Sequence, residues 1–122
     1  MKHKKYDNFK TKSVSSSLVR FAIDFQPEFV SDEVKQIAQL SLFDWFLVSV
    51  AGQTEPVSNI IRGQIKSDGG TEECTVIGTA QRFPARASAL ANGTISHALD
   101  YDDTNFAYLG HPSVAIIPAA IA

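Results

Sequence analysis

The segment HALDYDDTNFAYLGHPS, from His97 to Ser113, combines two histidines with three aspartates. Imidazole and carboxylate groups are the side chains that most often act in general acid–base catalysis. The segments on either side, ARASALANGTIS and VAIIPAAIA, consist of small or apolar residues and are suited to burial. We therefore interpret the acidic segment between them as a candidate site of proton transfer.

The two histidines of this segment are expected to lie at opposite kinds of helix end. His97 falls in the last turn of one helix and close to the aspartates, an environment that favours a charged imidazole. His111 lies at the start of the next helix, where the positive end of the dipole favours a neutral imidazole. Groups with such different surroundings suit acid–base chemistry. His111 is the better catalytic candidate, whereas for His97 a purely structural role is an equal alternative.

Two kinds of ligand are considered for this segment. The backbone N–H groups from Ser113 onward would point out of a helix N-terminus and could hold a substrate carboxylate. His97, Asp100 and His111 could in principle ligate a transition metal, but no HExxH or Cys/His spacing supports this alternative. The stretch DYDDTN begins like a calcium loop, yet Asn105 stands where that loop needs Gly. We therefore expect no metal here.

Hydrophobic periodicity and helix-stop residues predict a mainly α, helical-bundle-like fold with at most one short β-strand or hairpin. Ser31 has the character of an N-cap, Pro27 ends the helix before it, and Pro84 and Pro112 suit first turns. The expected helices cover residues 15–25, 31–51, 56–66, 84–99 and a last one from 112 onward, and the expected strand covers 72–78.

Two of these helices are expected to be buried. The second half of the 31–51 helix, LFDWFLVSV, is apolar almost all round, which is typical of a helix packed between others. The 84–99 helix is expected to bury a stripe of mainly small residues that allows close helix–helix approach: Ala87, Leu90, Ala91, Thr94 and Ala98.

Composition limits the classes of protein and partner. The chain has 122 residues, of which 44% are hydrophobic and 20% charged, as in one globular domain. A net charge of −2 gives no reason to expect nucleic acid or a membrane as partner. Cys74 is the single cysteine, which favours a reducing, cytoplasmic location. We expect residues 1–13 to be a basic flexible tail and residues 14–122 to form a helical domain that is truncated at its C-terminus.

The motifs ANGTISHALDYDDT and HPSVAIIPAAIA resemble the signature region of the MmgE/PrpD family, which includes 2-methylcitrate dehydratase, cis-aconitate decarboxylase and iminodisuccinate epimerase. The stretches VKQIAQLSLFDWFLVSVAG and CTVIGTAQRFPARASALANG also resemble this family. The resemblance implies the N-terminal part of a large helical domain, no metal or organic cofactor, and a homodimer. It also implies small di- or tricarboxylate substrates and proton transfer at a carbon next to a carboxylate.

The resemblance also implies roles for individual residues. Asp100, Thr104 and His111 match active-site positions of the family: His111 as proton donor or acceptor, Asp100 as the group that orients it, and Thr104 as a hydrogen-bond partner of a substrate carboxylate. His97 and Asp103 match the motif as pocket-forming residues. The candidates for substrate binding are therefore Thr104, His97 and Asp103, together with Ser113.

The leading hypothesis is that the chain is part of a lyase. Dehydration of 2-methylcitrate or citrate is the first choice of reaction, and decarboxylation and epimerisation are the alternatives. Members of the family are several times longer than this chain, so the isolated chain is expected to be inactive. The competing hypothesis is a non-catalytic helical interaction module, a remnant of such an enzyme.

Overall fold

The computed structural model describes residues 13–107 and 109–122, and the chain divides into two compact units, Met1–Val34 and Lys35–Ala122. Apart from Ser13, the tail expected over 1–13 lies outside the described residues. In the first unit, α1 (Val14–Asp24) is capped by Ser13, whose side chain accepts the N–H of Ser16, and a 3-10 turn (Pro27–Phe29) follows. The helix expected over 15–25 is therefore confirmed.

The second unit is mainly helical, as expected, and contains one two-stranded sheet. The N-terminus of α2 (Asp32–Gly52) belongs to the first unit, where the Ser31 hydroxyl accepts the N–H of Val34 as a cap. Among the described residues, no helix is long and apolar enough to cross a lipid bilayer. The elements are α2 (Asp32–Gly52), α3 (Pro56–Asp68), β1 (Cys74–Thr75), β2 (Arg82–Phe83), α4 (Ala85–Ser96) and α5 (Ser113–Ile121).

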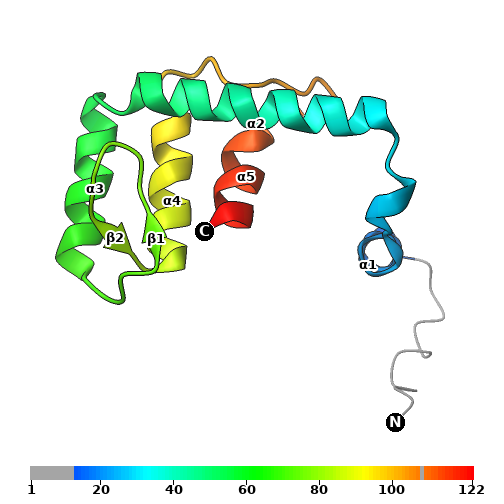
Figure 1. Cartoon of the computed structure of the whole chain (residues 1–122), viewed down its shortest axis with the longest axis horizontal. Coiled ribbons are helices and arrows are strands. Elements are labelled where there is room, and N and C mark those ends of the chain that lie inside the picture. The colour runs from blue at the N-terminus through cyan, green and yellow to red at the C-terminus, as the bar shows by residue number, and fades with distance from the viewer. Residues whose placement is uncertain (1–12, 108) are drawn as a thin grey trace, which may run out of the picture. The chain divides into compact units, whose positions relative to one another are not determined.

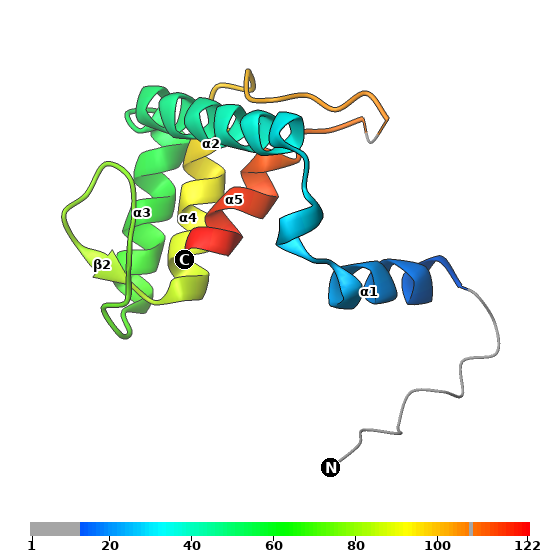
Figure 2. The ribbon, with the colours of Figure 1, turned by 45° about the vertical axis from the view of Figure 1, so that its right-hand side comes forward.

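Helix α4 packs between α3 and α5, while the C-terminal half of α2 runs across one end of these three helices (Figures 1 and 2). Small residues permit the closest approaches. A Cβ on Gly93 would lie 2.9 Å from the Val114 carbonyl oxygen, and one on Gly52 would lie 2.5 Å from that of Ile95. The expectation of close helix–helix packing through small residues is confirmed.

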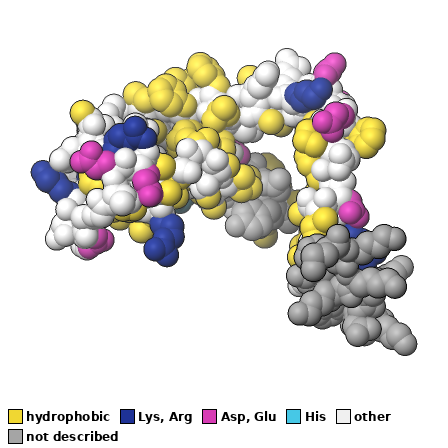
Figure 3. Space-filling model, turned by 60° about the horizontal axis from the view of Figure 1, so that its bottom comes forward, with side chains coloured by type: hydrophobic (Ala, Val, Ile, Leu, Met, Phe, Trp, Pro, Cys, Tyr) yellow, Lys and Arg dark blue, Asp and Glu magenta, His cyan; other side chains and the backbone are white. Residues whose placement is uncertain are grey.

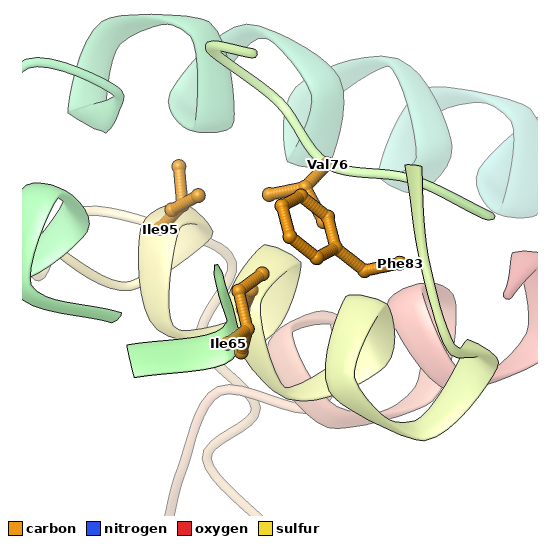
Figure 4. Packing of buried hydrophobic residues seen from close by; sticks show 5 residues of the cluster. Ile65, Val76, Phe83 and Ile95 are labelled. Atoms are coloured by element: carbon orange, nitrogen blue, oxygen red, sulfur yellow. The ribbon is translucent and has the colours of Figure 1, made fainter. Parts of the chain in front are cut away.

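The hydrophobic core lies between α3, α4 and the β-hairpin. Its buried members Ile65, Val76, Phe83 and Ile95 point toward one another (Figure 4). The strands pair antiparallel, with Cys74 opposite Phe83. The single short hairpin allowed by the sequence is therefore present. The strand expected over 72–78 was too long, and the position of its partner β2 was not predicted because two residues are too few to show a periodic pattern.

The stripe predicted for α4 was partly wrong. Ala91 is fully buried, but Leu90 is 61% exposed. Polar residues occupy much of the buried face because they hold the hairpin. Asn92 accepts the N–H of Ile77 and donates to the Thr75 carbonyl, and Ser88 donates to hairpin carbonyls. A stripe counted from apolar residues alone could not include them.

The prediction that the second half of α2 is buried on all sides was also wrong. Trp45 and Val48 are buried, whereas Phe43, Phe46 and Leu47 are 61%, 51% and 49% exposed. Hydrophobic side chains remain visible at the surface of the described chain (Figure 3). The helix crosses the ends of its neighbours, so only one face of it can meet them.

Candidate active site

The turn after α4 brings its acidic residues back toward the helix end. Helix α4 ends at Ser96, three residues before the predicted end, and the N–H of His97 bonds to the Gly93 carbonyl as the C-cap. Asp100 then adopts a positive φ of 53°, a conformation that Asp tolerates better than most residues. This left-handed residue reverses the chain, and the residues that follow it lie against His97.

Two imidazole rings and two carboxylates meet at this turn. The Nδ1 atom of His97 lies 2.9 Å from Oδ1 of Asp102, and its Nε2 atom lies 3.7 Å from Oδ1 of Asp100. His111 contacts the same pair: its Nδ1 is 3.4 Å from Oδ1 of Asp102, and its Nε2 is 3.5 Å from Oδ1 of Asp100. The ring centroids are 4.9 Å apart. We call His97, Asp100, Asp102 and His111 the His–Asp cluster.

This geometry corrects the expected difference between the two histidines. They were predicted to lie in opposite electrostatic environments, one near acids and the other at a helix N-terminus. Both rings instead face Asp100 and Asp102. The prediction failed because the turn at Asp100 carries the acids between the two helix ends rather than leaving them beside His97 alone.

Asp102 is the buried centre of the cluster, and it was missing from the predicted site residues. Its side chain is 1% exposed, whereas those of Asp100, His97 and His111 are 76%, 43% and 26% exposed. Its Oδ2 atom is buried and has no hydrogen-bond partner among the described residues. The only sequence signal was its place in DYDD, where three similar acids stand together.

Asp103 and Ser113 are joined to each other. Oδ1 of Asp103 accepts the N–H of Ser113 at 3.2 Å, and Oδ2 accepts the Ser113 hydroxyl at 2.7 Å. The carboxylate thus caps the N-terminus of α5, where the helix dipole favours negative charge. The Ser113 N–H that was expected to hold a substrate carboxylate is used inside the chain, and substrate contact by either residue stays a prediction.

Thr104 lies just beyond these residues. It is exposed and does not belong to the His–Asp cluster. An isolated bridge between Asn105 and Gly110 closes the following loop, which returns the chain to His111. The role expected for Thr104, hydrogen bonding to a substrate carboxylate, stays a prediction.

The donor atoms of the His–Asp cluster lie within 4.8 Å of one another and could hold a divalent metal ion. Two imidazole nitrogens and two carboxylate oxygens form a donor set that suits first-row transition metals. The same atoms also form a network of histidine–carboxylate contacts without a metal. Such a network can carry protons, since imidazole both donates and accepts.

Comparison with known proteins identifies the family of the chain. Residues 16–122 match the MmgE/PrpD N-terminal domain. The chain belongs to the MmgE/PrpD family. It is also similar to the cis-aconitate decarboxylase-like protein oryM of Aspergillus oryzae, with 26% identity over 110 residues. This alignment covers 90% of the chain and 23% of that relative, so the chain spans about a quarter of the relative's length.

Proposed function

We propose that the His–Asp cluster is one wall of the active site of a lyase or isomerase that acts on small di- or tricarboxylates. The reaction would move a proton at a carbon next to a carboxylate. The observation that carries this proposal is the convergence of both imidazoles and both carboxylates at one partly exposed place. Imidazole and carboxylate groups that lie this close together can pass a proton between them, which is the chemistry that general acid–base catalysis requires.

In this proposal His111 is the proton donor or acceptor, and Asp100 orients its ring. Thr104 would bind a substrate carboxylate, and His97, Asp103 and Ser113 would form the wall of the pocket. The described cluster holds acids but no Lys or Arg, although the substrate is an anion. We therefore propose that cationic groups come from sequence outside these 122 residues and that the chain alone is inactive.

Dehydration of 2-methylcitrate or citrate is our first candidate reaction. Decarboxylation of cis-aconitate is the second, and the name of the Aspergillus oryzae relative favours it. Both reactions break a bond at a carbon next to a carboxylate and need a proton at that carbon or at the leaving group. Family membership supports the shared step and does not choose between the two reactions.

The experiment is an assay of the polypeptide from the complete reading frame that contains these residues. 2-Methylcitrate, citrate and cis-aconitate would be supplied separately, with a chelator present. We expect turnover of at least one substrate, and a fall in kcat of at least about 10²-fold in His111→Asn. His3→Asn makes the same change in the basic N-terminal segment and should leave kcat unchanged.

The alternative is a non-catalytic helical interaction module. It predicts no turnover of any of the three carboxylates and no difference between His111→Asn and the parent protein. This result would remove the enzymatic proposal.

We further propose that the protein is cytoplasmic and forms a homodimer. The single Cys74 supports the location, and family membership and the exposed apolar face of α2 support the dimer. Light scattering of the complete protein measures its subunit number. A monomeric mass would contradict the dimer.

A further inference from the structure

The two histidines share one hydrogen-bonding partner, and both approach it with the same ring nitrogen. Nδ1 of His97 lies 2.9 Å from the carboxylate of Asp102. Nδ1 of His111 lies 3.2 Å from the backbone carbonyl oxygen of Asp102 and 3.4 Å from its carboxylate. One residue therefore contacts both imidazoles through two different acceptors.

These partners determine where the imidazole protons lie. A backbone carbonyl can only accept, so Nδ1 of His111 must donate in this hydrogen bond. An ionised carboxylate also only accepts, so Nδ1 of His97 carries a proton as well. In the neutral rings the lone pair is then on Nε2. Oδ1 of the exposed Asp100 lies 3.7 Å from Nε2 of His97 and 3.5 Å from Nε2 of His111, and it can accept a proton from these atoms only when the ring is an imidazolium.

The burial of Asp102 indicates more than a stabilising role. A buried carboxylate oxygen without a hydrogen-bond partner is unfavourable, and Oδ2 of Asp102 is such an atom among the described residues. The neighbouring Asp100 has a positive φ. Local departures from favourable structure that coincide at one place are typical of functional sites.

We propose that Asp102 is a positioning residue that holds His97 and His111 as Nδ1–H tautomers. Nε2 of His111 is then the atom that exchanges the substrate proton. When Nε2 takes a proton, the Asp102 carboxylate stabilises the imidazolium that forms. The inference rests on the proposed function for the role of His111, and the tautomers themselves can be measured without any substrate.

The first test uses the 15N-labelled chain with the His3→Gln change, which leaves only the two imidazoles of the site. Long-range 1H–15N spectra recorded over a series of pH values distinguish the two neutral tautomers from each other and from the imidazolium form. We expect the Nδ1–H form at both His97 and His111. An Nε2–H form at either residue overturns the proposal, and no variant of the site is needed for this result.

The second test replaces Asp102 with Asn, an amide of nearly the same size. An amide N–H facing Nδ1 of His97 needs an acceptor there, so we expect His97 to change to the Nε2–H tautomer. His111 should keep Nδ1–H because the backbone carbonyl remains. Asp102→Glu restores a carboxylate and should restore the original tautomer of His97.

Asp68→Asn is the matched control, since it makes the same change at an exposed acid on α3 that accepts a hydrogen bond from Gln64. It should leave both tautomers unchanged. Amide spectra show whether each variant is folded. A folded Asp102→Asn chain in which His97 keeps Nδ1–H contradicts the proposal, and if the variant does not fold, the tautomers of the unmodified site decide.

In the complete protein, Asp102→Asn should lower kcat at least about tenfold with little change in KM, because the imidazolium loses its partner and substrate binding is unaffected. An unchanged kcat in an active enzyme overturns the inference about Asp102 alone. Nδ1–H tautomers in a protein that turns over no carboxylate would instead contradict the proposed function.

Discussion

Asp100 has a backbone conformation that is unfavourable for most residues, and its carboxylate belongs to the His–Asp cluster. Its φ is 53°, and it follows the C-terminal end of α4, where the helix dipole disfavours acids. Its Oδ1 lies within 3.7 Å of Nε2 of His97 and 3.5 Å of Nε2 of His111. A glycine would fit this backbone better but would contribute no carboxylate.

We therefore predict opposite effects of Asp100→Gly on stability and on activity. The free energy of unfolding should rise by up to about 1 kcal/mol, because glycine adopts positive φ without strain and removes a charge from the helix end. The kcat of the complete enzyme should fall, because Nε2 of His111 loses its carboxylate neighbour. Urea unfolding and steady-state kinetics measure the two effects.

Asp100→Ala is the control for this prediction, because it removes the same carboxylate but keeps a Cβ. It should be less stable than Asp100→Gly and equally impaired in turnover. Equal stability of the two variants would show that the backbone at this position is not strained.

The residues of the site differ in how far the sequence could reveal them. His97 and His111 were proposed because their residue type and their places at helix ends suggest proton transfer, whereas the role of Asp100 came from the resemblance to the family. Asp102 was missed because the sequence places three similar acids together, and only the turn decides which of them is buried. The link between Asp103 and Ser113 joins residues ten positions apart and depends on the path of the loop between them.

At the scale of the elements, the N-terminus of α4 depends on a side chain from the hairpin. Its N-cap residue, Pro84, makes no side-chain hydrogen bond, and Oε2 of Glu73 instead accepts the N–H of Ala85 at 2.9 Å. This hydrogen bond, with a smaller contribution from Thr71, lowers the pKa of Glu73 below its ordinary value of 4.5. The carboxylate form is therefore favoured in the folded chain.

This lowered pKa predicts a pH dependence of stability. A group whose pKa is lower in the folded state stabilises the fold above its unfolded pKa, and the stabilisation is lost as the pH falls through the folded pKa. The urea concentration at the unfolding midpoint should therefore decrease as the pH is lowered below about 4.5. This decrease per pH unit should be smaller in Glu73→Gln than in the unmodified chain. Glu72→Gln removes the neighbouring charge without this hydrogen bond. Parallel slopes for Glu73→Gln and the unmodified chain would contradict the capping role.

Helix starts were easier to predict from the sequence than helix ends or buried faces. Ser31, Pro56 and Pro112 mark starts through local chemistry, and the structure begins α2, α3 and α5 within one residue of them. The end of α4 depends on the turn at Asp100, which packs against His97. Its buried face depends on hydrogen bonds from Asn92 to the hairpin. These tertiary contacts have no local signal.

At the scale of the second unit, one close contact connects α2 to the site. A Cβ on Gly52 would lie 2.5 Å from the carbonyl oxygen of Ile95. The same oxygen accepts the N–H of Ala98 in the turn that carries His97. The position of α2 and the position of the site are therefore coupled through the last turn of α4, although much of α2 is exposed.

We predict that Gly52→Ala destabilises this unit and disturbs the site, since either the α4 turn or α2 must shift. The expected loss is about 1–3 kcal/mol in the free energy of unfolding. The 15N chemical shift of Nδ1 of His97 should also change.

Gly63→Ala is the matched control. A Cβ on Gly63 in α3 would meet no atom within 4 Å, so the higher helix propensity of alanine should raise the free energy of unfolding by about 0.5–1 kcal/mol. Because both variants add one methyl group to a helix, a difference between them measures the contact between α2 and α4. If Gly52→Ala is as stable as Gly63→Ala and the His97 signal is unchanged, α2 does not hold the end of α4, and the turn alone must position the imidazole.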